Sequence, residues 1–330
     1  MGEAGRIIRF TTAALLYLFL CVSHADPADP AEAGRAQARQ AESLQVLGKN
    51  PQAIDAYRQA LRLAEQGTDR AWQVLLQGQL GGALLAAGQL DEAEQMLRDG
   101  LTAAQALEDP GLQASLNNNL AHVLQAQGNA TAALALFRES AALAKRAAAP
   151  ALQAKSSLGA AGILLASGGD VVEAQSLIEQ AWMVTSGLPS SRRKAWLMLS
   201  NANKLQELAS VSSKNSEALL VVVERLQAAA GLADSLGDAR TASHAYGSLG
   251  ALYEQQGQYP EALSLTDTAV FMTQQVHAPE LRYRWEWQQG RILAAQGRSL
   301  QALDAYRRAA ATLQTIRAEF SAGSETIAAT

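Results

Sequence analysis

Apolar residues recur along this chain at intervals of three and four positions, the spacing of helices that are apolar on one face. Leu80 and Leu84 show the pattern in one stretch, Leu97 and Leu101 show it in the next, and Leu249 and Tyr253 show it in another. The stretches are interrupted by a short phrase in which a Gly is followed five residues later by an Ala. The phrase recurs every 40 to 44 residues in seven copies, of which the fifth is divergent and has Ser in place of Gly. The copies are Gly48 and Ala53, Gly88 and Ala93, Gly128 and Ala133, Gly169 and Ala174, Ser213 and Ala218, Gly257 and Ala262, Gly297 and Ala302.

Each glycine of the phrase is predicted to end a first helix, because the left-handed backbone that closes a helix is cheap only without a Cβ atom. A second helix is predicted to begin two residues later. Asn50, Asn215 and Ser299 occupy that position in three copies, where their side chains can accept hydrogen bonds from the first turn. Pro51 and Pro260 follow, at a position where a missing N–H costs nothing. The chain therefore predicts a series of helical hairpins.

Each alanine of the phrase has a partner twelve residues upstream, on the first helix of the hairpin. The seven partners are Ala41, Gly81, Ala121, Gly162, Gln206, Gly250 and Gly290, and all of them except Gln206 are Gly or Ala. Small residues at both positions let two helices approach closely where they cross. A hairpin cannot cover its own apolar face, so each one is expected to pack on the next.

These features predict an all-α fold, an α-solenoid of about seven hairpins over residues 26–320, followed by a weakly structured tail at 321–330. The composition agrees: hydrophobic residues, mostly Ala and Leu, make up 48% of the chain, and aromatic residues make up 5%. Such a mixture suits long helices packed through small side chains.

The sixth hairpin carries the spacing that identifies a family. Its Tyr246, Leu249, Gly250, Tyr253 and Gly257, with Ala262, resemble a tetratricopeptide repeat, and the likeness extends over roughly residues 31 to 320. The period of 40 to 44 exceeds the usual 34 and resembles the longer-helix variant of the repeat. Gln206 and Ser213 depart from the pattern in the fifth hairpin.

The N-terminus has the features of a signal peptide over residues 1–25. Arg6 and Arg9 precede an apolar run, and Ser23 and Ala25 supply small residues for cleavage. The run is too short to span a bilayer, and the bulky residues before Cys21 disfavour a lipoprotein site. We therefore expect export through the Sec pathway to the periplasm or beyond the cell, with no stable membrane span after cleavage.

Charge and residue spacing argue against several classes of function. The net charge is -4 and no Lys/Arg-rich block occurs, which disfavours nucleic acid as a partner. His122, His244 and His277 lie in different hairpins without paired spacing, so we expect no metal site. The glycine pair near Asp170 lacks a following Gly-Lys-Ser/Thr and predicts no phosphate loop. We expect neither a cofactor nor enzymatic activity.

The remaining candidate is a surface. In the tetratricopeptide family the first helices line a concave groove, and this resemblance implies the following contact residues for a peptide or protein: Asn118, His122, Asn203, Glu207, Arg284, Trp287 and Arg291. The last three combine Trp and Arg, which are enriched at binding hot spots and suit an acidic or carboxylate-ended peptide. The alternative is that Trp285 and Trp287 are divided between core and groove.

Two functions fit these expectations. The first is a non-catalytic, exported scaffold for protein–protein interaction. The second follows from the last repeats, around residues 279–320, which resemble the repeat region of exported bacterial CHAT-domain proteins. That resemblance implies the recognition or regulatory half of a caspase-like peptidase, with the catalytic domain absent from this chain. The last helix carries Leu300, Leu303, Leu313, Ile316 and Phe320, so its uncovered face is expected to meet such a domain or a second copy in a homodimer.

Overall fold

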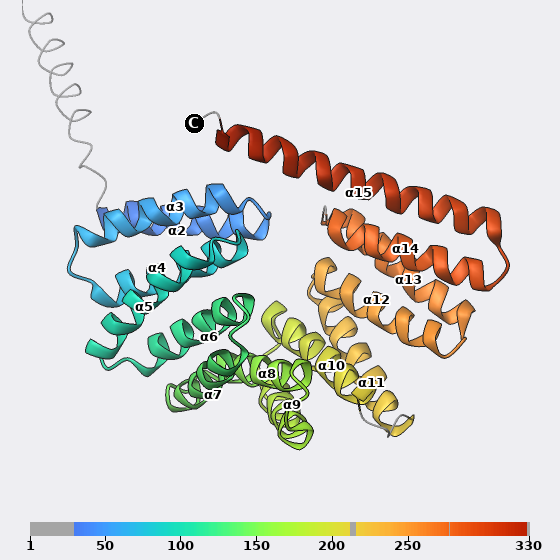
Figure 1. The fold of residues 1–330 in the computed structure, drawn as a ribbon, viewed down its shortest axis with the longest axis horizontal. Coiled ribbons are helices and arrows are strands. Elements are labelled where there is room, and N and C mark those ends of the chain that lie inside the picture. Colours follow the sequence, from blue (N-terminus) through green and yellow to red (C-terminus); the bar gives the residue numbers. More distant parts are fainter. Residues whose placement is uncertain (1–29, 212–215, 277, 329–330) are drawn as a thin grey trace, which may run out of the picture. The chain divides into compact units, whose positions relative to one another are not determined.

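The computed structural model describes residues 30–211, 216–276 and 278–328, which form fourteen helices (Figure 1). The predicted signal peptide and Ser213 lie outside these residues. The helices group into two compact units, residues 1–127 and 128–330. The all-α hairpin architecture predicted from the repeated phrase is confirmed.

The described part of the first unit, residues 30–127, contains five helices of nearly equal length. They pack in sequence, so that α2 contacts α3, α3 contacts α4 and α5 contacts α6. Their bounds are α2 Pro30–Val46, α3 Asn50–Glu65, α4 Arg70–Ala86, α5 Leu90–Ala106 and α6 Pro110–Ala126.

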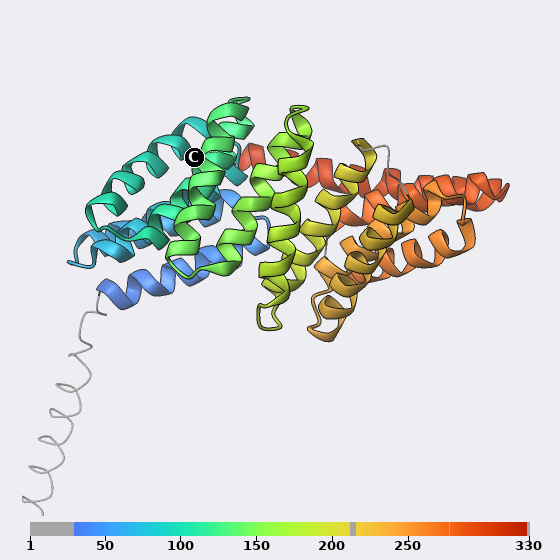
Figure 2. The ribbon, with the colours of Figure 1, turned by 90° about the horizontal axis from the view of Figure 1, so that it is seen from below.

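The described part of the second unit contains nine helices. The first helix of each hairpin packs on the first helix of the next, so that α10 contacts both α8 and α12, and α12 contacts α14. Figure 1 shows the orange to red helices α12 to α15 stacked in chain order, and Figure 2 shows the same helices from below. The bounds are α7 Ala130–Arg146, α8 Pro150–Ala166, α9 Val171–Ser186, α10 Arg192–Val211, α11 Ser216–Ser235, α12 Ala239–Gln255, α13 Tyr259–Gln275, α14 Pro279–Ala295 and α15 Ser299–Ala328. Among the described helices, none combines the length and apolar character that crossing a bilayer requires.

The predicted crossings of small residues hold the hairpins together. Ala41, Ala53 and Ala93 are fully buried. A Cβ atom on Gly81 would lie 2.5 Å from the Leu97 side chain, so the contact between α4 and α5 leaves no space for a larger residue. Close packing of this kind explains why the phrase repeats.

The turns follow the predicted chemistry with two corrections. Gly88 and Gly168 have positive φ, 76° and 65°, whereas Gly169, the predicted position, does not. Its N–H instead bonds the Leu164 carbonyl at 2.8 Å, one residue past the left-handed position. Asn50 does not cap α3, because its amide donates to the Ala86 carbonyl of α4 at 3.1 Å. Side-chain caps come from other residues: Asp69, Asp109, Asn129, Asp170 and Asp238.

A buried arginine ties together α9, α10 and α11. Arg225 is 6% exposed, and its guanidinium lies 4.6 Å from the centre of the Trp182 ring. It donates to Glu179 at 2.6 Å and to the Asn201 carboxamide oxygen at 2.8 Å. Pairing compensates the desolvation of a buried charge. This network joins α9 of the fourth hairpin to the fifth hairpin, whose two helices each have 20 residues and account for the longer local period.

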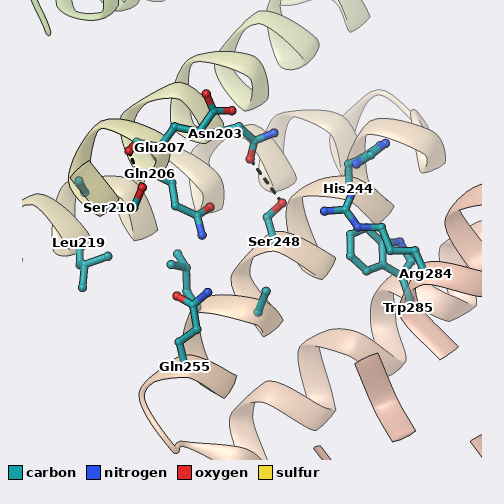
Figure 3. Close-up of a pocket in the computed structure, with 13 residues that line it drawn as sticks. Asn203, Gln206, Glu207, Ser210, Leu219, His244, Ser248, Gln255, Arg284 and Trp285 are labelled. Atoms are coloured by element: carbon teal, nitrogen blue, oxygen red, sulfur yellow. Dashed lines mark hydrogen bonds between the residues drawn. The ribbon is translucent and has the colours of Figure 1, made fainter. Parts of the chain in front are cut away.

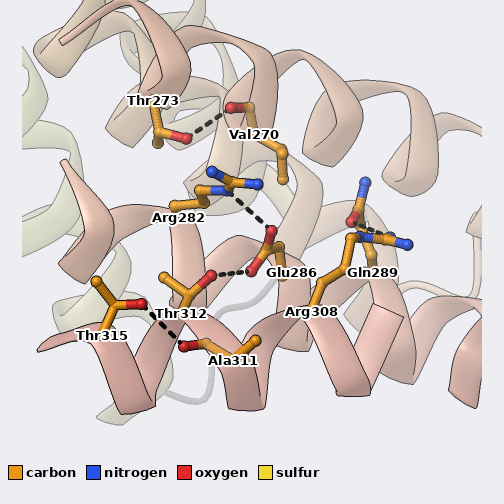
Figure 4. Close-up of polar contacts among 9 residues, drawn as sticks. All are labelled: Val270, Thr273, Arg282, Glu286, Gln289, Arg308, Ala311, Thr312 and Thr315. Carbon is orange, nitrogen blue, oxygen red and sulfur yellow. Dashed lines mark hydrogen bonds and ion pairs between the residues drawn. The ribbon is translucent and has the colours of Figure 1, made fainter. Parts of the chain in front are cut away.

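A buried carboxylate joins α14 to the last helix (Figure 4). Glu286 is fully buried and accepts hydrogen bonds from the Arg282 Nε atom at 2.9 Å and the Thr312 hydroxyl at 2.8 Å. The helix α15 has 30 residues and remains helical through Ala328, in contrast to the weakly structured tail predicted for residues 321–330.

The apolar face predicted on the last helix is only partly uncovered. Leu300 and Leu303 are 81% and 45% exposed, whereas Leu313 and Ile316 are half-buried. The side chain of Phe320 lies outside the described part of the structure. The exposed leucines are therefore confined to the first turns of α15.

Candidate functional site

The candidate site is a cavity of about 550 Å³ in the second unit, lined mainly by the first helices α10, α12 and α14 (Figure 3). Residues spaced by three or four positions on each helix face it, as the helical period requires. Its lining is Asn203, Gln206, Glu207, Ala209, Ser210, Leu219, His244, Ser248, Ala251, Leu252, Gln255, Arg284 and Trp285.

One end of the cavity is built around Trp285. This side chain is 1% exposed, and its Nε1–H donates to the Ser243 hydroxyl at 3.0 Å. The Ser243 hydroxyl donates in turn to the Ala269 carbonyl at 2.9 Å. Gly247 leaves room for the indole, because a Cβ atom there would lie 2.5 Å from three Trp285 ring atoms. The ring is therefore held in one orientation by packing and by a buried hydrogen-bond chain.

Two polar side chains, those of Arg284 and His244, pack against the Trp285 ring. The guanidinium carbon of Arg284 lies 4.9 Å from the centre of the Trp285 ring. The His244 ring meets Trp285 edge-on, with centroids 6.0 Å apart and planes at 87°. Figure 3 shows these three residues gathered at one end of the cavity.

The other end of the cavity is rich in amides. Gln206 and Gln255 face it from α10 and α12, and neither side chain has a hydrogen-bond partner within the described residues. Asn203 uses its oxygen to accept a long hydrogen bond of 3.4 Å from Ser248. The floor includes the buried Leu252. The cavity thus combines apolar surface with donors and acceptors that the protein leaves free.

The structure brings together only part of the predicted site. Asn203, Glu207 and Arg284 line the cavity. Asn118 and His122 lie on α6 of the first unit, where Asn118 is completely buried and His122 is half-buried.

The other two predicted residues lie on α14 outside the cavity lining. Trp287 is 48% exposed and packs against Tyr306 of α15, with ring centroids 4.9 Å apart. Arg291 donates two hydrogen bonds to the Glu254 carboxylate, at 2.8 and 2.9 Å. The alternative that the two tryptophans are divided is correct in that Trp285 belongs to the core.

Sequence reasoning assigned no role in the site to Gln206, Ser248 or Gln255. The sequence pattern predicts a small residue at the position of Gln206, but this side chain is half-buried and lines the cavity. The spacing of His244, Ser248 and Gln255 along one helix face is the signal that identifies the lining of α12. Among the described residues, no three His, Cys, Asp or Glu side chains are grouped as metal ligands would be.

Comparison with known proteins supports the repeat architecture. Two family models described as tetratricopeptide repeat match residues 32–106 and 114–150. No curated protein matches the sequence.

Solved structures share the fold at low identity. One is a signal transduction ATPase with a tetratricopeptide repeat sensor from Pyrococcus horikoshii: TM-score 0.62, 15% identity, covering 87% of this chain and 43% of that one. The apo form of RapI matches with TM-score 0.58 and 12% identity, covering 86% of this chain and 98% of that one. The Rap conjugation gene regulator of plasmid pLS20, solved with the Phr* peptide, matches with TM-score 0.55 and 15% identity, covering 78% of this chain and 66% of that one.

The chain spans less than half the length of the ATPase, so the similarity concerns only a part of that protein. Family matches, helical hairpins and structural neighbours agree, and the chain is a tetratricopeptide repeat protein.

Proposed function

We propose that this protein is a protein–protein interaction scaffold whose second unit binds an extended peptide segment of a partner in the cavity between α10, α12 and α14. The observation that carries the proposal is the pair of unpaired amides, Gln206 and Gln255, above an apolar floor. An extended peptide presents one free N–H and one free C=O per residue. Carboxamide side chains satisfy both, because each offers donors and an acceptor.

The size of the cavity supports a short segment. Its volume of about 550 Å³ falls within the range of roughly 300–1,000 Å³ that is typical of ligand pockets. The structural neighbour solved with the Phr* peptide shares this fold and gives the proposal an analogy among repeat proteins.

Selection from a displayed library of random peptides tests the proposal. Selected peptides should bind the wild-type protein, and Gln206→Ala with Gln255→Ala should weaken binding about tenfold or more through the loss of two hydrogen bonds. Gln274→Ala is the matched control, since Gln274 is exposed on α13 away from the cavity. Equal binding by the double variant and the control would refute the assignment of the site.

We also propose that the protein acts after export, on the basis of the apolar run and small residues in its first 25 positions. Fractionation of cells that express the full chain, with the N-terminus of the product sequenced, tests this. A product that begins at Met1 and stays in the cytoplasm would contradict export.

The recognition half of a CHAT-type peptidase remains an alternative that rests on the resemblance of the last repeats. Translating the encoding locus past the codon for Thr330 tests it directly. A caspase-like domain with paired His and Cys would favour the alternative, and a locus without one would favour the scaffold.

A further inference from the structure

Arg284 differs from the arginines around it because it has no anionic partner among the residues that the structure describes. Arg240 on α12 pairs with Glu280 at 2.7 Å. On α14, Arg282 pairs with Glu286 and Arg291 pairs with Glu254. Within the described residues, the Arg284 guanidinium makes neither an ion pair nor a hydrogen bond, although it lines the cavity. Its five N–H donors are therefore available to a ligand.

The Arg284 head is held where a ligand can reach it. Its guanidinium lies over the Trp285 indole, which is fixed by the hydrogen bond to Ser243. A cation over an indole is stabilised by the ring quadrupole without using its in-plane donors. A planar carboxylate can then accept from those donors in a bidentate arrangement.

His244 is the second polar group at this end of the cavity. Its pKa is lowered, first by burial and then by the positive charges of Arg284 and Arg240, while Glu280 opposes the shift. From α10, Glu207 also lines the cavity but is paired with Lys204 at 2.8 Å. The helix α11 contributes only Leu219 to the lining, and α13 contributes no residue. His244 therefore stays neutral near pH 7 in the unliganded protein.

We propose that Arg284 and His244 form a carboxylate subsite for the bound peptide, and that peptide binding tightens when His244 takes up a proton. The proposal rests on the proposed function of this cavity and names the chemistry of its ligand. The carboxylate belongs either to a peptide C-terminus or to an acidic side chain. In both cases it places a negative charge beside the imidazole and compensates the cations that disfavour protonation.

The direction of the pH dependence follows from linkage. A ligand carboxylate favours the charged imidazole, so the pKa of His244 is higher in the complex than in the free protein. Binding and protonation then favour each other, and affinity rises as the pH falls from about 7.5 to about 5.5. A rise of one pKa unit corresponds to a tenfold gain in affinity, so we expect a gain of about that size.

Nuclear magnetic resonance of the histidine ring protons tests the subsite with three probes. These are acetyl-trialanine with a free C-terminus, its C-terminal amide, and acetyl-Ala-Glu-Ala-amide. The His244 signal is assigned with His244→Gln, and the amide signals of Gln206 and Gln255 are assigned with the corresponding alanine variants.

We expect at least one carboxylate probe to raise the pKa of His244 in the wild-type protein and to lose this effect in Arg284→Gln. An effect of the free C-terminus alone identifies a terminal carboxylate, and an effect of the Glu probe identifies a side chain. An unchanged His244 titration with both carboxylate probes, an equal shift with the neutral amide, or an equal shift in Arg284→Gln would overturn the subsite.

The glutamine signals separate the two hypotheses. Shifts of the Gln206 and Gln255 amides with every probe, while the His244 titration stays constant, would overturn the subsite and leave peptide binding in the cavity intact. The proposed function itself fails only if the selected peptides do not depend on these two glutamines.

Discussion

Replacing Ser243 with alanine should measure how strongly the hydrogen-bond chain beneath the cavity stabilises the second unit. Ser243 is fully buried, accepts from the Trp285 Nε1–H at 3.0 Å and donates to the Ala269 carbonyl at 2.9 Å. The alanine variant leaves the indole N–H without an acceptor in a site that is closed to water. The Ala269 carbonyl lies inside α13 and keeps its helical hydrogen bond.

The expected cost is that of one buried, unsatisfied donor, about 1–3 kcal/mol in the free energy of unfolding. Urea unfolding followed by far-ultraviolet circular dichroism measures it as a lower midpoint. Ser248→Ala is a matched control on the same helix, because Ser248 is half-buried and makes only a 3.4 Å hydrogen bond to Asn203. The control should change stability by no more than about 0.5 kcal/mol. Equal midpoints for the two variants would refute the reasoning.

Three further predictions concern the second unit. The pKa of His244 is lowered in the folded chain, so below about pH 6.5 the unfolded chain takes up a proton there more readily and stability should fall as the pH drops. The urea midpoints measured at two pH values should therefore differ less in His244→Gln than in the wild-type protein. An unchanged difference would contradict the role of this residue. Thr312→Val should lower the free energy of unfolding by about 1–3 kcal/mol, because it removes one of two donors to the buried Glu286 carboxylate. The control Thr315→Val, on the exposed face of α15, should lower it by less than about 0.5 kcal/mol, and urea unfolding compares the two variants. If the exposed leucines of α15 form a homodimer, Leu300→Glu with Leu303→Glu should halve the mass measured by sedimentation without loss of helical content; a wild-type chain that is already monomeric would dispose of the dimer.

The hairpins were predictable because their signals are local. The repeated Gly marks a left-handed turn, and the Ala twelve residues after a small residue marks a close crossing, so a single sequence displays both. Even there, the left-handed position in "ASGGD" is Gly168 rather than Gly169, since two adjacent glycines can serve equally well. The helix caps were less predictable, because Asn50 uses its amide across the hairpin boundary instead of at its own helix.

The site was only partly predictable, because its decisive contacts join residues far apart in the sequence. Trp285 and Trp287 point about 200° apart around a helix, so one had to be buried if the other was exposed. Trp285 is the buried one because Gly247 on α12 has no side chain and leaves space for its indole ring. Gly247 precedes Trp287 by forty positions, so no local spacing on α14 reveals this contact. The sequence pattern predicts Trp287 in the groove, whereas Arg284 lines the cavity over the buried Trp285 and Trp287 packs against Tyr306.

The same limit applies to the buried charges. Arg225 reaches Glu179 across 46 positions, and Glu286 reaches Thr312 across 26. Neither partner follows from spacing, because helical periodicity predicts contacts only three or four residues apart. Gln206 shows the converse, since this residue breaks the expected pattern of small residues in the core and lines the candidate cavity.

The central claim, that the cavity between α10, α12 and α14 receives a peptide, is tested most directly by photo-cross-linking. A peptide selected on the wild-type protein and carrying a benzophenone side chain would be irradiated in the complex, and the attachment sites would be mapped by mass spectrometry. We expect attachment to the cavity-facing residues of α10 and α12, among them Gln206, Ser210 and Gln255. Attachment confined to helices of the first unit, or spread evenly over the second, would contradict the claim.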